Sequence, residues 1–461
     1  MNWGNQQTAE ESGFRTGDGG RPAATGVSRR RLLTATVPAV LLAACSVGQG
    51  GGTPAASQGP KTVIFHTDWI ATARGETIKR ALEQWATENP TIKIDQQPST
   101  ALANQSYLDG LIARLAGDTI GDVALWEIGY VQLWASRNTF ANIGPVLAKL
   151  KYKLDDHYYH PGAIFYQNKQ HGMPFQFSVT SWAYNRTLFK LKQVPEPADN
   201  WTWDDLIDTA KRLTEPDKNV WGLRWQESSN IWALIYAHNG EMINKERTKS
   251  TFDTPETLAG VEYGLGLIHR HQIAPTLAEH NAKQLDMLKG NYGIWSGGQN
   301  PKGLQAQAGN LFEVGVAPLP TVKSTGKKIA TMFDQPHVVL AASQKHGVLD
   351  EATRLAIFLA GDFVGALQND LNPGGMPTKK SFLESAAYLV NPPANSKRVL
   401  DSFKFTHPDI DLFPGRAEWL AAWRPYMQRA MNGQMSAREF VQQATLAADA
   451  GLASALAKGS S

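Results

Sequence analysis

Short apolar runs and amphipathic stretches alternate along the chain from residue 61 onward. Runs rich in β-branched and aromatic residues at 61–66, 91–96 and 122–126 predict three strands. Between them, apolar residues recur every three or four positions over 75–89 and 107–116, which predicts two helices. This order predicts an α/β fold with a parallel, doubly wound sheet. Ligands of such a sheet bind beyond the carboxyl ends of its strands.

The second half of the chain continues this alternation. Thr202 is a good N-cap for a helix. The adjacent carboxylates Asp204 and Asp205 are interpreted as first-turn acids that the helix dipole favours, rather than as a catalytic pair. Trp201 and Trp203 are predicted to pack in a core. The other predicted helices lie at 258–271, 283–288, 351–363 and after the capping box at Ser436–Glu439. Strands are predicted at 313–319 and 338–342, together with a strand that runs into a Gly-rich loop at 291–300, and a strand, polar loop and helix within 221–243.

The N-terminus carries a predicted export signal. Three arginines at 29–31 precede a 13-residue apolar run from Leu32 to Ala44. Pro38 interrupts this run, which is shorter than the ~20 residues of a spanning helix. The run ends in a sequence similar to a lipobox, in which a peptidase cuts before a lipid-carrying cysteine. Cys45 is the single cysteine of the chain and is therefore predicted to carry a lipid anchor.

Two export routes fit this signal. The paired arginines match the twin-arginine motif, but Leu32 stands where phenylalanine is commoner, so the general secretory route stays open. Residues 46–60 are uncharged and rich in Gly, Ser, Pro and Ala, which predicts a flexible tether between the anchor and the folded part.

Composition narrows the range of functions. The formal net charge of +3 falls to about +1 when the five arginines and three acids of the signal are removed, which gives no electrostatic reason to expect nucleic acid. About 400 folded residues indicate two or more domains. The chain has 14 tryptophans, several of them in polar, Gly-rich stretches, where an indole either packs in a core or stacks on a sugar ring.

Seven stretches in order resemble the family of extracellular sugar-type solute-binding proteins, the receptors of ABC importers. The resemblance covers nearly all of residues 61–455 and follows a lipoprotein-type signal. Its stretches are the first strand with its Trp loop, LIARLAGDTIGDVALWE (111–127), GMPFQFSVTSWAYN (172–185), NWTWDDLIDTAKRLT (200–214), GNYGIWSGGQ (290–299), VGVAPLP (314–320) and ATRLAIFLAGDF (352–363).

The resemblance implies a two-lobe periplasmic-binding-protein (Venus-flytrap) fold with a hinge of crossing strands. The first crossing is expected near 175–178 and the second near 320–332. Asp334–His337 is expected as a ligand-facing loop in place of the glycine common in the family, and 387–414 as a variable excursion. The expected boundaries are 1–44 for the signal, 45–60 for the lipidated Cys45 and tether, 61–176 and 331–405 for lobe 1, and 177–330 and 406–461 for lobe 2.

The function implied is capture of a sugar or oligosaccharide in the cleft and delivery to an ABC permease. The implied protein is a monomer without a cofactor, anchored through Cys45 on the outer face of the cytoplasmic membrane, and not an enzyme. The candidate ligand-binding residues lie at strand ends, near the first crossing and in polar loops: Asp68, Trp69, Trp126, Glu127, Gln176, Ser178, Trp225, Trp232, Trp295, Gly297, Gln299, Asp334 and Gln335.

Two alternatives stay open at this point. The same fold could bind a polyamine, because acids and aromatics stand together at 68–69 and 126–127. A secreted glycan-acting enzyme would need two carboxylates across a cleft, and the sequence contains no GxSxG, HExxH or phosphate-loop motif. The best metal-like cluster is 155–157 with His160, in a predicted loop.

Overall fold

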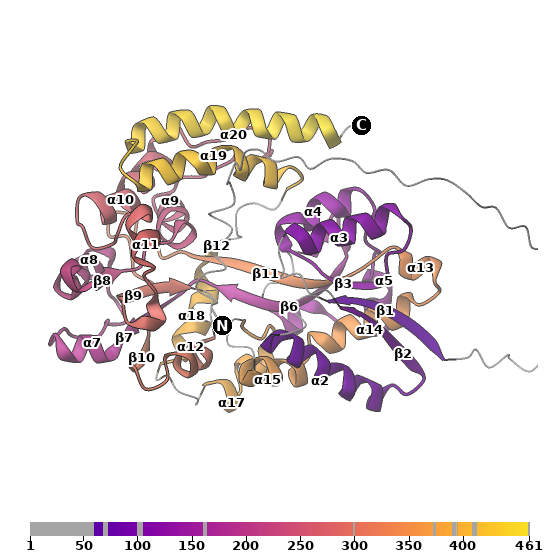
Figure 1. Cartoon of the computed structure of the whole chain (residues 1–461). Coiled ribbons are helices and arrows are strands. Elements are labelled where there is room, and N and C mark those ends of the chain that lie inside the picture. Colours follow the sequence, from indigo (N-terminus) through magenta and orange to yellow (C-terminus); the bar gives the residue numbers. More distant parts are fainter. Residues whose placement is uncertain are drawn as a thin grey trace, which may run out of the picture. The chain divides into compact units, whose positions relative to one another are not determined.

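Two β-sheets organise the folded part of the chain (Figure 1). The computed structural model describes residues 60–67, 72–98, 105–159, 164–297, 300–371, 375–389, 393, 395–407 and 413–459. We call the six-stranded sheet with its helices the first lobe, and the four-stranded sheet with its helices the second lobe.

The first-lobe sheet has the strand order β12-β11-β3-β1-β2, with β6 paired to β11. Strand β1 lies parallel to both β2 and β3, which confirms the predicted parallel sheet, whereas β11 runs antiparallel to β3 and β6. Its strands are β1 (Lys61–Thr67), β2 (Ile92–Pro98), β3 (Val123–Leu125), β6 (Gly172–Val179), β11 (Ala330–Val339) and β12 (Thr406–His407).

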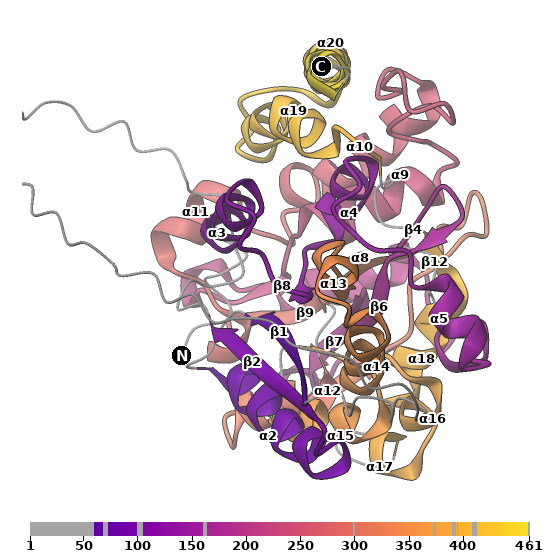
Figure 2. The ribbon, with the colours of Figure 1, turned by 90° about the vertical axis from the view of Figure 1, so that its right-hand side faces the viewer.

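Helices cover both faces of this sheet, as a doubly wound fold requires. Figure 2 shows α2 on one side of β1 and β2, and α3 and α4 on the other. Along β3, Val123 and Leu125 enter the core beneath α2, whereas Ala124 enters the core beneath α3 and α4. The helices of this lobe are α2 (Ala73–Glu88), α3 (Gln105–Ala116), α4 (Ile128–Ser136), α5 (Gly144–Lys149), α6 (Leu154–His157), α13 (Ala342–Lys345), α14 (Leu349–Leu359) and α15 (Asp362–Leu371), beside the small hairpin β4 (Phe165–Tyr166) and β5 (Lys169–Gln170).

The second-lobe sheet has the order β10-β7-β9-β8, in which β8 and β9 are parallel. Its strands are β7 (Ser181–Asn185), β8 (Trp221–Leu223), β9 (Tyr292–Gly297) and β10 (Val314–Ala317). Its helices are α7 (Arg186–Leu191), α8 (Trp203–Leu213), the π-helix η3 (Glu227–Trp232), α9 (Ala233–Ala237), α10 (Pro255–His269), α11 (Leu277–Lys283) and α12 (Pro301–Ala308).

The C-terminal helices pack on the second lobe. Trp419 and Trp423 of α19 and Phe440 of α20 surround Phe252, and all four rings belong to one buried cluster. The helices of this region are α16 (Lys380–Leu383), α17 (Ala386–Leu389), α18 (Lys397–Ser402), α19 (Arg416–Met431) and α20 (Ala437–Gly459), which begins at the predicted capping box.

Local sequence explains helix α8 well. The Thr202 hydroxyl accepts a hydrogen bond from the Asp205 backbone N–H, and the Asp205 carboxylate accepts one from the Thr202 N–H, which completes a capping box. Asp204 pairs with Lys323, so both acids have structural roles. Trp201 and Trp203 are buried in the core, as predicted.

Strands β6 and β11 join the two lobes. At its start β6 places Met173 in the first-lobe core, and at its end it places Val179 in the second-lobe core. Strand β11 runs the opposite way, from Met332 in the second-lobe core to Val339 in the first-lobe core. The two strands pair antiparallel along most of their length.

The expected loop at Asp334–His337 is wrong, because these residues lie within β11. Backbone pairing to β6 along this stretch, and to β3 from His337 onward, extends the strand through polar side chains. The predicted helix at 283–288 is also wrong: α11 ends as Gln284 takes a left-handed conformation with φ of 48°, and a separate 3₁₀ turn follows at 287–289.

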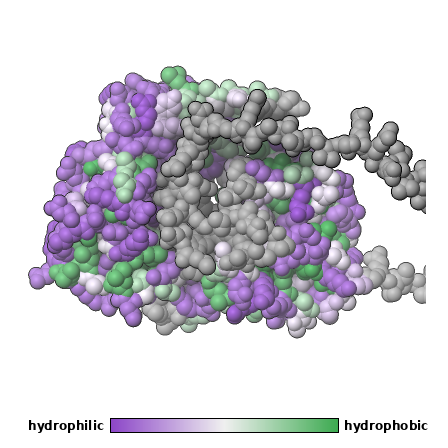
Figure 3. Space-filling model, in the orientation of Figure 1, coloured by the Kyte–Doolittle hydropathy of each residue, from purple (hydrophilic) through white to green (hydrophobic). Residues whose placement is uncertain are grey.

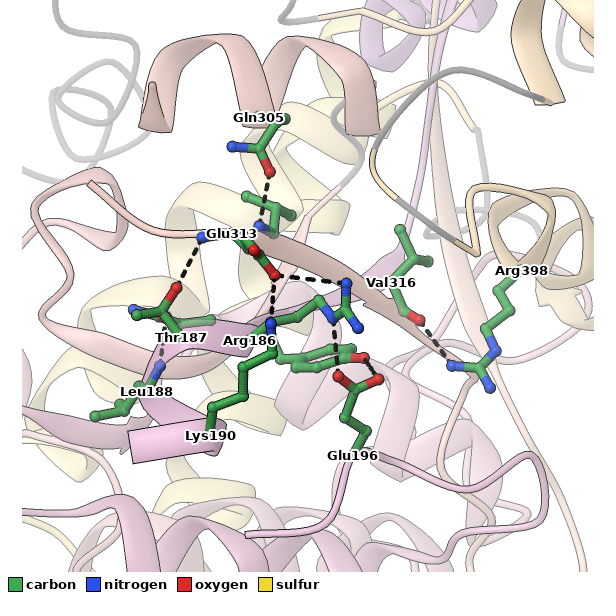
Figure 4. A network of polar contacts seen from close by, with 12 residues as sticks. Arg186, Thr187, Leu188, Lys190, Glu196, Gln305, Glu313, Val316 and Arg398 are labelled. Atoms are coloured by element: carbon green, nitrogen blue, oxygen red, sulfur yellow. Dashed lines mark hydrogen bonds and ion pairs between the residues drawn. The ribbon is translucent and has the colours of Figure 1, made fainter. Parts of the chain in front are cut away.

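Side chains protect the edge strand β10 (Figure 4). The Val314 N–H donates to Gln305 Oε1 at 2.8 Å, and the Val316 carbonyl accepts from Arg398 Nη1 at 2.9 Å. Arg186 pairs with Glu196 in the same network. These bonds occupy backbone groups that would otherwise pair with another chain.

We predict that Gly222→Ala destabilises the second lobe. A Cβ on Gly222 would lie 2.0 Å from the Ala210 carbonyl oxygen, because β8 packs closely on α8. The expected loss is about 2–3 kcal/mol, measured by urea unfolding.

The matched control is Gly110→Ala on the exposed face of α3. No atom lies within 4 Å of its added Cβ, so we expect a gain of up to about 1 kcal/mol from helix propensity. Equal unfolding free energies for the two variants would contradict the close approach of β8 and α8.

Candidate functional site

The carboxyl ends of β1 and β3 meet at one edge of the first-lobe sheet, beside β11. Glu127 follows β3 and is the N-cap residue of α4, with its side chain half-buried. The Trp126 backbone N–H donates to the Pro336 carbonyl at 2.9 Å, which joins the end of β3 to β11. Gln335, which directly precedes Pro336 in β11, therefore lies beside Glu127.

A chain of hydrogen bonds runs across this edge. Gln335 Nε2 donates to Glu127 Oε1 at 2.6 Å, and Gln335 Oε1 accepts from Arg74 Nη2 at 2.7 Å. Arg74 stands in the first turn of α2 and is only 1% exposed. We call Arg74, Gln335 and Glu127 the amide bridge, because a neutral amide connects a buried cation to a carboxylate.

A β-bulge lies at the same place. Gln335 pairs with Gln176, but the next residue, Pro336, pairs with Pro174, so the register shifts. Bulges bend a strand and change the direction of nearby side chains. The Gln176 side chain packs on Gly375, where an added Cβ would lie 2.1 Å from its Cδ.

His337 forms a dry layer next to the bridge. Its ring is fully buried between two phenylalanine rings. The centroid of the imidazole lies 5.3 Å from that of Phe65 and 4.3 Å from that of Phe175. Neither ring nitrogen has a hydrogen-bond partner among the described residues. Burial, with a smaller contribution from the Arg74 charge, lowers the pKa of His337 to about 3. The imidazole is therefore neutral at physiological pH.

In the second lobe, the parallel strands β8 and β9 end at a shared edge. Ser296 Oγ donates to Gln226 Oε1 at 3.2 Å and is hydrogen bonded to Ser229 Oγ. Ser181 Oγ donates to the Gly297 carbonyl at 3.1 Å. The π-helix that follows β8 starts here, and π-helical turns are frequent at functional sites.

Two arginines of α19 lie at this second edge. Arg424 Nε is 3.5 Å from Glu227 Oε1, and its guanidinium lies over the Trp232 ring. Burial raises the pKa of Glu227, and Arg424 and Arg416 oppose that rise. Arg416 also contacts the first lobe, since a Cβ on Gly129 of α4 would lie 2.6 Å from its Nη1. Figure 1 shows α19 extending toward α4.

On the face shown in Figure 3, hydrophobic residues are scattered among hydrophilic ones. Within the described ranges, no group of three or more His, Cys, Asp or Glu side chains is placed to hold a metal ion. In the same ranges, no helix combines the length and apolar character needed to cross a bilayer.

Comparison with known proteins identifies the family. The sequence matches the pattern of the bacterial extracellular solute-binding proteins over residues 69–366. The chain belongs to this family. It is thereby placed among binding proteins of the extracellular or periplasmic space, as the resemblance implied.

Solved structures confirm the two-lobe fold of this solute-binding protein. An ABC substrate-binding protein from Listeria monocytogenes, in complex with cycloalternan, has a TM-score of 0.71 at 19% identity and covers 86% of this chain and 99% of its own. A cyclic α-maltosyl-1,6-maltose binding protein from Arthrobacter globiformis has a TM-score of 0.70 at 18% identity, with coverages of 86% and 99%. A solute-binding protein from Thermotoga lettingae, bound with α-D-tagatose, has a TM-score of 0.68 at 18% identity, with coverages of 85% and 100%.

The structure brings some of the predicted ligand-binding residues together. Glu127, Gln335 and Gln176 are neighbours at the first-lobe edge. Half-buried Ser178 lies further along β6, and half-buried Gly297 ends β9 in the second lobe. Three of the predicted residues, Asp68, Trp69 and Gln299, lie outside the described residues, as do Cys45, His160 and the side chain of Asp334.

The four described tryptophans of the predicted site are buried. Trp126 packs on Phe140, and the Trp225 Nε1–H donates to the Gly264 carbonyl at 3.1 Å. None of the four exceeds 9% exposure, so this arrangement offers none of their ring faces to a ligand: Trp126, Trp225, Trp232 and Trp295.

Sequence reasoning missed four charged residues at these edges: Arg74, Glu227, Arg416 and Arg424. No pattern in the sequence indicated Arg74, because the predicted helix began at 75; only the structure places this arginine in the first turn of α2, where a cation opposes the helix dipole. The other three lie in a segment predicted as a loop or in the C-terminal helices, where no pattern indicated a site.

We predict that His337→Phe reduces the pH dependence of stability. The folded-state pKa of about 3 lies below the ordinary value of 6.5, so the unfolded chain binds more protons between these limits. Stability therefore falls as the pH drops below 6.5, by up to about 1.4 kcal/mol per pH unit for this histidine.

Urea unfolding at pH 7.5, 5.5 and 4.5 measures this effect. Phe keeps the ring packing without a titrating group, so the variant should match the parent at pH 7.5 and lose less stability at pH 4.5. His66, whose pKa burial lowers to about 4, titrates in both proteins and cancels in the difference. Identical pH profiles would contradict a buried, neutral His337.

Proposed function

We propose that this solute-binding protein captures a sugar or oligosaccharide between its lobes and delivers it to an ABC permease. The observation that carries the proposal is the placement of hydrogen-bonding side chains at the strand ends of both lobes and on the joining strands β6 and β11. Carboxylate and amide groups such as Glu127, Gln176 and Gln335 match the hydroxyl groups of a saccharide. The saccharides bound by the three relatives support the same class.

The charges around the site favour a neutral ligand over a polyamine. Arg74 is connected to Glu127 through one amide, and Arg416 and Arg424 surround Glu227. Each carboxylate therefore has cations of the protein nearby. The arginines would repel a cationic ligand that bound to the acids, whereas the uncharged hydroxyl groups of a saccharide would not be repelled. We propose binding without a chemical step, by a monomer that needs no cofactor.

We propose that the lobes are divided at the bounds that the resemblance implied, with 61–176 and 331–405 in lobe 1 and 177–330 and 406–461 in lobe 2, except for α16–α18. The buried residues of these three helices, Phe382, Tyr388 and Val399 among them, belong to the second-lobe core, so we assign the helices to lobe 2. A hinge at β6 and β11 would let the lobes close on a ligand that contacts both of them.

We propose further that the chain is a lipoprotein. Residues 1–44 would direct export, by the twin-arginine route or the general secretory route, and Cys45 would carry the lipid. The receptor would then be held at the outer face of the cytoplasmic membrane, close to its permease.

A ligand screen tests the proposed function. The full chain carrying Cys45→Ala is screened by thermal shift and tryptophan fluorescence against saccharides, polyols, polyamines and amino acids. We expect a saccharide to raise the melting temperature, with an affinity that changes little between low and high salt. A response to polyamines alone, weakening steeply with salt, would contradict the sugar assignment.

Glu127→Gln is the sharpest single variant for this site. It keeps the size of the side chain but removes a charged acceptor, so we expect saccharide affinity to fall about tenfold, measured by calorimetry. Glu83→Gln, on the exposed face of α2, is the control and should bind as the parent does. An unchanged affinity in a folded Glu127→Gln protein would remove this residue from the site.

Cys45→Ala tests the anchor. We expect the native protein to fractionate with membranes and to label with a fatty-acid probe, and the variant to do neither. A variant that stays on membranes after a high-salt wash would contradict anchoring through Cys45.

A further inference from the structure

Arg74 is an unusual residue for its position. It lies in the first turn of α2, where the helix dipole disfavours a cation, and its side chain is almost completely buried. A buried charge is costly unless it is hydrogen bonded to a compensating group. Arg80, one and a half turns further on, shows the ordinary alternative, since it is exposed and pairs with Glu76 at 2.8 Å.

The amide bridge supplies this compensation at a distance. Gln335 accepts from the guanidinium with its oxygen and donates to Glu127 with its nitrogen, so both ends of its dipole face the opposite charge. The two charged partners fix which way the amide points, because the reversed orientation would place a donor against Arg74. The carboxylate of Glu127 is thereby held at Oε1.

The surroundings make this arrangement rigid. The bulge between Gln335 and Pro336 lies where β3 ends, and the Trp126 N–H bond fixes the backbone there. The aromatic layer of Phe65, His337 and Phe175 beside it is buried. Hydrogen bonds to charged groups are strong in such a low-dielectric setting.

We propose that Arg74 is a positioning residue, which acts through Gln335 to orient Glu127 toward the hydroxyl groups of a neutral ligand. The part of this inference that concerns the ligand rests on the proposed function, whereas the amide bridge itself does not depend on it. It deepens that function by giving Glu127 a fixed orientation and by placing a buried cation behind it, which disfavours positively charged ligands. Arg74 itself makes no contact with the ligand in this proposal.

Two double-mutant cycles test the proposal, both on the full chain carrying Cys45→Ala. The first measures urea unfolding without ligand for Arg74→Met, Glu127→Gln and the double variant. Met keeps the unbranched apolar stem of the side chain and removes its charged guanidinium group. We expect non-additive losses, because removal of either end leaves the bridge incomplete. Additive losses would overturn the bridge, whichever solute the protein binds.

The second cycle measures saccharide affinity with the same variants. We expect Arg74→Met to weaken binding roughly tenfold, Arg74→Lys to recover part of that loss, and the double variant to bind no worse than Glu127→Gln alone. Arg80→Met, on the same helix, is the control and should bind normally. A stability loss for Arg74→Met with unchanged affinity would show a merely structural role and overturn the proposal.

Gln335→Glu keeps the test decisive if Arg74→Met does not fold. The new carboxylate would pair with Arg74 and repel Glu127, so we expect a folded protein with at least tenfold weaker saccharide binding. Full affinity in this variant would overturn the proposal. A coupled first cycle in a protein that binds no saccharide would instead refute the proposed sugar function and leave the bridge standing.

Discussion

Backbone hydrogen bonds between β6 and β11 connect the cores of the two lobes, and the position of the site depends on them. Each strand places apolar side chains in both lobes, so the pairing is fixed by burial at its two ends. The middle of the pair can therefore carry polar residues, because its backbone groups are already satisfied. Gln335 and Gln176 are paired in this middle part. The bulge beside them lies next to the carboxyl end of β3, at the sheet edge that carries Glu127.

Charge is distributed across the site in a consistent way. In the first lobe, a neutral amide connects Arg74 to Glu127, with one hydrogen bond to each charged group. In the second lobe, Glu227 is paired with Arg424. Arg74 and Glu227 are largely buried, so the removal of a charged partner of either residue is expected to be costly. This distribution of charge is the reason for our proposal that the ligand offers hydroxyl groups rather than a net charge.

Elements governed by local patterns were predictable. The strands at 61–66 and 122–126 and the helix that starts at Thr202 depend on periodicity and capping, which act over a few residues. The predictions at Asp334–His337 and 283–288 failed for physical reasons. Strand pairing extended β11 through a polar stretch, and a left-handed residue ended α11 early. Burial likewise placed Trp232 and Trp295 in cores, where the sequence alone suggested stacking surfaces.

The sequence by itself determined the order of elements, the family, the predicted export signal and part of the proposed site, namely Glu127 and the glutamines at the crossing. Only the tertiary structure decided which polar residues meet. Arg74 and Gln335 are 261 positions apart, and Gln335 and Glu127 are 208 apart. Their contacts follow from strand order and register, because these set which distant segments share a sheet edge. Periodicity along the chain carries no information about that pairing, and so Arg74, Arg416 and Glu227 emerged only from the folded protein.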